Sequence, residues 1–128
     1  MRSGLLGRAA GATALGLVIA SCNSSTSYGG GGGCTPTATQ VCMVGLSFSP
    51  ASLTVTAGTT VTWNNGSSTT HSVTSATGST DVYDSPDIGV GSTFQHTFAT
   101  AGTYHYYCRF HGTNGNPPTG MSGTITVN

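Results

Sequence analysis

The chain has 128 residues, of which only 5% are charged, and its three basic and three acidic side chains give a formal net charge of zero. This charge content excludes a nucleic-acid binder that works by neutralising phosphates, because such proteins need clustered lysine and arginine. The composition includes 23 threonines, 16 serines and 20 glycines. Because β-branched threonine and turn-forming glycine favour strands over helices, we expect one all-β domain of ordinary size.

The first 21 residues have the features of an export signal. Arg2 and Arg8 precede an uncharged stretch from Ala9 to Ala20. These twelve residues, at ~1.5 Å each in a helix, are too short to cross a hydrocarbon core of ~30 Å. The segment therefore predicts export of the chain rather than a membrane-spanning anchor.

The tetrapeptide that ends this segment, Ile19 to Cys22, resembles the lipobox of bacterial lipoproteins. That resemblance implies that Cys22 becomes the lipid-modified first residue of the mature protein; an ordinary cleavage site with a chance cysteine is the alternative. Residues 22–33 would then be the lipidated cysteine and a flexible tether rich in serine and glycine. We expect an exported domain, residues 34–128, anchored by lipid to the periplasmic or extracellular face of a cell-envelope membrane.

Removal of residues 1–21 leaves one basic side chain, Arg109, against Asp81, Asp84 and Asp87, a net charge of −2. No basic patch remains for nucleic acid or anionic lipid. The three aspartates are interpreted as part of a solvated loop, with a docking patch for a partner as the alternative.

The expected export of the chain suggests different roles for its cysteines. In an oxidising space, Cys34 and Cys42, which precede the first expected strand, could close a small disulfide loop. Cys108 is then left without a partner, and a metal site is one explanation for an unpaired cysteine in an exported protein.

Seven short runs are predicted as strands because they are rich in β-formers and are separated by turn residues. They span residues 44–50, 52–56, 59–64, 70–75, 93–99, 102–108 and 122–127, with an irregular excursion at 76–91. Their number and spacing predict a Greek-key β-sandwich. Strand alternation places Tyr104, Tyr106 and Cys108 on the inward face, and His105 and Tyr107 on the other.

Candidate metal ligands gather at the end of the run 102–108. His111 follows Cys108 by three residues, and Met121 comes after a stretch rich in glycine and proline that can fold back. His71, on a separate strand, is the candidate for a second imidazole. Two imidazoles, a thiolate and a weak thioether are the donor set of a blue copper site. A zinc site is the alternative for the Cys-x2-His spacing, although zinc sites with a thioether are uncommon.

At this point the sequence resembles the cupredoxin family, and its plastocyanin-like members in particular. The motifs that carry the resemblance are Val61–Asn65 leading to His71–Val73, Gly91–Phe94 leading to His96–Phe98, Ala101–Cys108 with His111, and Gly120–Val127. The resemblance implies one type 1 copper per chain, with His71, Cys108 and His111 as equatorial ligands and Met121 as the axial ligand. Two departures are a longer loop between His111 and Met121, and Ser72 where many members carry asparagine.

The other two histidines are not expected to bind the metal. His96 shares its parity with Phe94 and Phe98, which predicts an inward, hydrogen-bonded structural role. His105 has the opposite parity to Cys108 and is expected to point away from the copper.

These features favour a mobile or membrane-tethered one-electron carrier rather than an enzyme. A copper-binding or trafficking protein of the cell envelope and a metal-free adhesion module are the alternatives. A hydrolytic Cys–His pair is disfavoured because the tight loop directs both side chains to one metal.

We expect a monomer that docks weakly with redox proteins at the His111 end. The expected patch is nearly uncharged, with Arg109 beside it as the single charged contact, and it is formed by Phe110, Gly112, Asn114, Pro117 and Pro118. A route through Tyr107, which resembles the second exit of plastocyanins, is the alternative.

Overall fold

The structure is a computed structural model that describes residues 33–128. The predicted signal peptide, the predicted lipid site Cys22 and nearly all of the predicted tether lie outside the described residues. Within the described part of the chain, no helix has the length and apolar character needed to cross a membrane.

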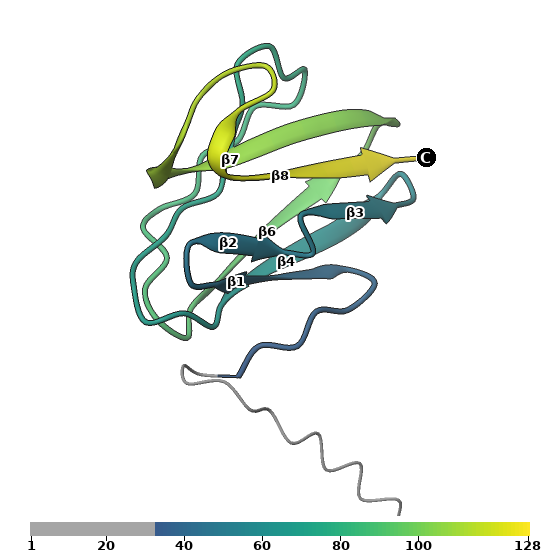
Figure 1. Cartoon of the computed structure of the whole chain (residues 1–128). Helices are drawn as coiled ribbons and strands as arrows, with labels where there is room; N and C mark the ends of the chain where they lie inside the picture. The colour runs from purple at the N-terminus through teal and green to yellow at the C-terminus, as the bar shows by residue number, and fades with distance from the viewer. Residues whose placement is uncertain (1–32) are drawn as a thin grey trace, which may run out of the picture.

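Eight strands form two four-stranded sheets, so the predicted all-β sandwich is confirmed (Figure 1). The first sheet has the order β2-β1-β4-β6 and the second β3-β8-β7-β5. The strands are β1 Gln40–Val44, β2 Ser47–Ser49, β3 Ser52–Val55, β4 Thr59–Asn65, β5 Thr74–Ser75, β6 Thr93–Phe98, β7 Gly102–Thr113 and β8 Thr119–Val127.

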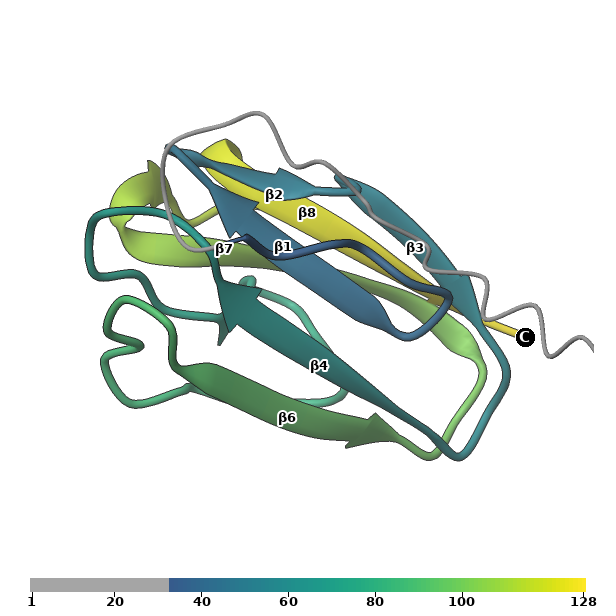
Figure 2. The same cartoon turned by 90° about the horizontal axis from the view of Figure 1, so that it is seen from below.

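Most neighbouring strands are antiparallel, but β1 pairs with β4 and β3 pairs with β8 in parallel. Figure 2 shows β1 on one side of β4 and β6 on the other. These crossovers join strands that are distant in sequence and bring the ends of β4, β7 and β1 to the same end of the sandwich (Figure 2).

The prediction missed β1 and placed the first strand too late. Cys42 was expected ahead of the first strand, whereas it lies inside β1, where three consecutive residues, Val41 to Met43, are fully buried. This pattern lacks the alternation that identifies a half-buried strand. A disulfide joins Cys42 to Cys34 and so fastens the start of the described chain to β1.

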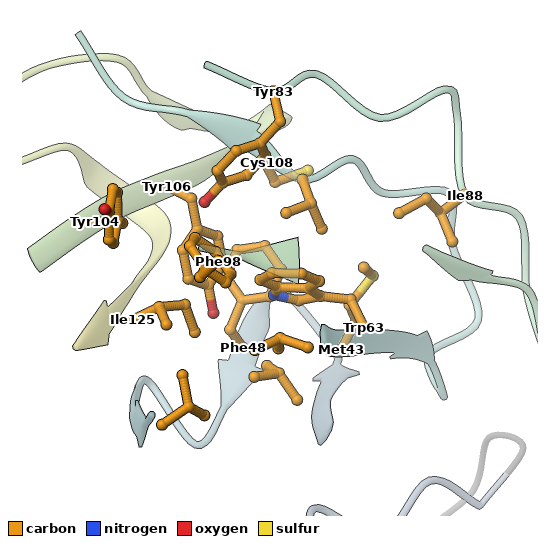
Figure 3. Packing of buried hydrophobic residues seen from close by; sticks show 14 of the residues in the cluster. Met43, Phe48, Trp63, Tyr83, Ile88, Phe98, Tyr104, Tyr106, Cys108 and Ile125 are labelled. Atoms are coloured by element: carbon orange, nitrogen blue, oxygen red, sulfur yellow. The ribbon is translucent and has the colours of Figure 1, made fainter. Parts of the chain in front are cut away.

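An aromatic cluster fills the space between the sheets (Figure 3). Trp63 of β4 is fully buried, and its ring centroid lies 5.4 Å from that of Tyr106 and 6.3 Å from that of Phe98. Phe48 packs edge-on against Tyr106 at 4.8 Å. Aromatic contacts of this kind stabilise a core beyond the area that they bury, and here they fix the inward row of β7 that ends at Cys108.

Gly123 of β8 lies directly opposite Tyr106 of β7, and a Cβ atom at this position would collide with the buried phenol ring. We therefore expect Gly123→Ala to lower the free energy of unfolding by about 1–3 kcal/mol, the usual cost of overpacking a core. Urea denaturation measures the change. The matched control is Gly89→Ala, where the nearest atom, Ser92 Oγ, is 3.9 Å away; equal stability loss in both variants would show that the Tyr106 contact is not the cause.

Candidate metal centre

Three of the predicted ligands meet at one end of the sandwich. His71 precedes β5, and Cys108 and His111 lie in the second half of β7. Cys108 Sγ is 3.7 Å from Nδ1 of His71 and 3.6 Å from Nδ1 of His111, and the two Nδ1 atoms are 3.2 Å apart. The three donor atoms therefore form a small triangle that can hold one metal ion.

Local irregularity in β7 allows two ligands from one strand to face the same point. The register of the β7–β8 pair shifts between Tyr107 and Gly112. In a regular strand, residues three apart point to opposite faces. The bulge removes that alternation, so the side chains of Cys108 and His111 converge.

A hydrogen bond determines which nitrogen of His71 faces the other ligands. Nε2 of His71 lies 2.8 Å from Ser67 Oγ, and the Ser67 hydroxyl donates to Asn65 Oδ1 at 2.8 Å. Because that hydroxyl proton is committed to Asn65, Ser67 accepts from Nε2–H of His71. Nδ1 is then the nitrogen with the free lone pair, as a metal ligand requires.

Asn65, at the end of β4, holds this loop in place. Its Nδ2 donates to the carbonyl oxygens of Thr69 at 2.7 Å and Ile88 at 2.8 Å, and its Oδ1 accepts from the backbone N–H of Ser67 at 3.0 Å. The sequence analysis named Asn65 only as the last residue of the Val61–Asn65 motif, and it assigned no role to Asn65 or Ser67 in holding His71. Their signal in the sequence is weak, since a short polar loop before a histidine is common.

The buried surroundings favour the neutral form of His71. The side chain is fully buried, and this burial, followed by the nearby His111 imidazole, lowers the pKa of His71, while the backbone of Gly45 opposes the shift. The neutral imidazole is the form that binds a metal. Cys108 is also fully buried, and its Sγ accepts a hydrogen bond of 3.4 Å from the backbone N–H of Ser72.

Met121 is buried at the start of β8, with 2% of its surface exposed. Two glycines, Gly112 and Gly120, face one another where β8 passes the ligand loop. A Cβ atom at Gly112 would lie 2.6 Å from the Met121 carbonyl oxygen, and one at Gly120 would lie 2.8 Å from the His111 carbonyl oxygen. The glycines thus let the strand that carries Met121 approach the loop that carries His111.

The two remaining histidines lie outside this cluster, as predicted. His96 is half-buried, its Nε2 is 2.9 Å from Asp81 Oδ2, and its ring stacks on Tyr83 at 4.3 Å. Nδ1 of His105 bonds to Thr124 Oγ1 at 3.0 Å on the outer face of the second sheet.

The charged residues lie partly as predicted. Asp84 and Asp87 are exposed, as expected of a solvated loop, but both also form ion pairs with Arg109, which the sequence analysis did not predict. Arg109 is therefore not a free cation beside the ligands. In addition, Pro118 is buried instead of contributing to the surface near His111, because it begins the return of the chain into β8.

The donor set fits a type 1 copper ion: two imidazoles and a cysteine sulfur converge from buried or half-buried positions, with a buried thioether on the adjoining strand. Thiolate sulfur suits Cu(I), and imidazole suits both copper oxidation states.

Comparisons with known proteins agree with this chemistry. A protein family described as copper binding proteins of the plastocyanin/azurin family matches residues 35–128. Plastocyanin of Scenedesmus fuscus is 35% identical over 94 residues, which cover 64% of this chain and 87% of that protein.

Solved structures give the same result. A purple cupredoxin from Nitrosopumilus maritimus aligns with a TM-score of 0.57 at 30% identity, covering 70% of this chain and 98% of that one. A copper-containing nitrite reductase from Thermus scotoductus aligns with a TM-score of 0.61 at 28% identity, but this chain matches only 25% of its length.

Cys108→Ser tests the ligand set. Serine nearly conserves volume but lacks the thiolate, so we expect the Cu(II)-loaded variant to lose the intense visible absorption near 600 nm that the family resemblance implies, while the fold remains. Absorption and circular dichroism spectra measure both. His105→Gln is the matched control, because His105 is a half-buried histidine of the same strand that points away; loss of colour in that variant would contradict the assignment.

Proposed function

Because this chain belongs to the plastocyanin/azurin family of copper-binding proteins, we propose that it is a one-electron carrier with His71, Cys108 and His111 as equatorial copper ligands and Met121 as the axial ligand. The observation that carries this proposal is the triangle of donor atoms within 4.8 Å of one another in a largely buried site. Bound copper would supply a Cu(II)/Cu(I) couple that gains and loses one electron.

The chain's own residues contribute rigidity and the exclusion of water. His71 and Cys108 are fully buried; His71 donates from Nε2–H to Ser67 Oγ, and Cys108 Sγ accepts from the Ser72 N–H, so that both side chains are held in one orientation. A ligand set that keeps one geometry in both oxidation states needs little reorganisation when an electron arrives. His111 is only half-buried, so its imidazole edge is the ligand nearest to a docked partner.

A small copper protein matches this chain over most of its own length. Plastocyanin of Scenedesmus fuscus is covered to 87% of its length. The likeness to nitrite reductase covers a quarter of that enzyme. Both observations favour a carrier over an enzyme.

Copper trafficking is the second candidate function. A trafficking site would need several accessible methionines to hold and release Cu(I). Only Met43 and Met121 belong to the predicted mature chain, and both are buried. The burial of Met43 in the aromatic core removes it as a donor and so favours electron transfer.

The copper-loaded protein is expected to give a reversible one-electron wave, with one electron per chain, in protein-film voltammetry. It should keep its copper in both oxidation states during incubation with a competing Cu(I) chelator, because the ligands are buried. Prompt loss of Cu(I) to the chelator together with a sluggish wave would favour trafficking instead.

The sequence supports a lipid anchor for this carrier. The segment that ends at Ser21-Cys22 predicts cleavage and acylation, and the serine- and glycine-rich stretch after it suits a tether. We expect mass spectrometry of membrane-extracted protein to find an acyl group on Cys22, and Cys22→Ser to move the protein to the soluble fraction. An unmodified, soluble mature chain would contradict the anchor.

The docking surface for redox partners is proposed at the His111 end. Phe110, beside His111, is 50% exposed, and Leu46, in the turn that approaches His71 through Gly45, is 57% exposed. Arg109 is engaged by two aspartates, so it is not available to steer an acidic partner. The encounter is then mainly apolar, which suits weak and short-lived redox complexes.

We expect Phe110→Ala to slow electron transfer with the native partner about tenfold, while Tyr107→Leu has little effect. The rate should also change little with ionic strength, because the patch lacks a free charge. Stopped-flow absorption measures both. Val82→Ala is the control, since Val82 is 81% exposed beside Asp81, the partner of His96. If only the Tyr107 variant is slow, docking at the His111 end is wrong.

A further inference from the structure

We propose that Arg109 is a positioning residue that holds residues 71–75 between β7 and residues 83–88, and so holds His71 against Cys108. Residues 83–88 are called the outer segment, and the contacts of Arg109 are called the strap. This role rests on the proposed copper site but not on electron transfer itself. The strap is built from an unusual pairing of segments that lies outside the regular sheets.

Residues 71–75 lie between two neighbours. On one side, Thr74 and Ser75 pair with Tyr107 and Tyr106 of β7. On the other side, residues 83–88 run antiparallel to them and act as an irregular outer strand. The bonds of that pairing are His71 N to Ile88 O at 3.1 Å, Ile88 N to His71 O at 2.8 Å, Ser85 N to Val73 O at 3.0 Å and Ser75 N to Tyr83 O at 2.9 Å.

Arg109 crosses this layer from β7 to the outer segment. Its guanidinium donates to Asp84 Oδ1, to the Ser85 carbonyl oxygen at 3.0 Å and to Asp87 Oδ1 at 3.2 Å. It also passes within 3.3 Å of Thr74 Oγ1, which itself donates to Asp84 at 2.8 Å. One planar side chain thus joins three adjacent segments, which a lysine could not match because it lacks the forked set of donors.

The backbone of Arg109 makes a second connection to the same segment. Its N–H donates to Ser72 Oγ at 2.8 Å, and the Ser72 N–H donates to Cys108 Sγ. Arg109, which follows Cys108, is therefore hydrogen-bonded to Ser72, which follows His71. The side chain of Arg109 then holds the outer segment next to that contact.

The strap is expected to act on the site more than on global stability. The carboxylates of Asp84 and Asp87 are 60% and 68% exposed, and exposed ion pairs contribute little to the free energy of unfolding. Groups that orient metal ligands, in contrast, typically change metal affinity 10–100-fold when they are removed.

Arg109→Met keeps most of the apolar stem and removes every donor of the side chain. We expect it to weaken Cu(II) binding about 10–100-fold in competition with a chelator. In the metal-free protein, hydrogen exchange at the Ile88 and Ser85 amides should become several-fold faster, while exchange in β4 and β8 stays unchanged. This second readout does not depend on copper, so it separates a failure of the strap from a failure of the proposed function.

Three variants sharpen the test. Asp81→Asn is the matched control, because it changes a hydrogen bond with His96 outside the strap and should leave affinity and exchange unchanged. Arg109→Lys keeps the charge and should not restore the parent affinity. The reduction potential should fall in Arg109→Met, which removes a positive charge near the site, and rise in Asp84→Asn, which removes a negative one.

Parent-like copper affinity and amide exchange in Arg109→Met would overturn the proposal. So would full recovery in Arg109→Lys, which would leave only an effect of charge. Faster exchange spread evenly over β4 and β8 would also overturn it, because that result describes global destabilisation.

Discussion

One constraint governs this molecule: three donor atoms, two from β7 and one from His71 before β5, must meet at a buried point with their lone pairs free. A buried imidazole that lacks a hydrogen bond on its second nitrogen has no fixed orientation. Its unpaired nitrogen also lowers the free energy of unfolding. Ser67 forms this hydrogen bond with His71, and Asn65 in turn accepts a hydrogen bond from the Ser67 hydroxyl. At one end of the sandwich, Asn65 at the end of β4 holds the loop that carries Ser67 and His71, and β7 supplies Cys108 and His111.

Much of this site could be predicted from sequence because its signals are local. Cys108 and His111 are three residues apart, and the alternation in β7 correctly sets Cys108 inward and His105 outward. The seven predicted runs also overlap β2 to β8, and of β1 they include only its last residue, Val44. β1 was missed because parallel pairing with β4 and disulfide bonding bury consecutive residues, which leaves no alternating pattern to recognise.

Other parts depend on loop closure and could not be predicted. The pairing of residues 71–75 with 83–88 uses a mixture of backbone and side-chain bonds, so residues 83–88 lack the pattern of a strand, and the predicted strand at 70–75 gave no sign of this partner. Only this pairing brings Asp84 and Asp87 to Arg109. Without it, the single cation of the predicted mature chain and its aspartates were naturally interpreted as independent, solvated charges.

The disulfide between Cys34 and Cys42 has a consequence for proteolysis. It closes a loop over residues 35–41, much of which is exposed. A protease that cuts one peptide bond within this loop leaves both fragments joined through sulfur, so the domain would stay connected to everything that precedes Cys34. Shedding of the domain by such a cut therefore needs a reductant as well as a protease, whereas a cut before Cys34 needs the protease alone.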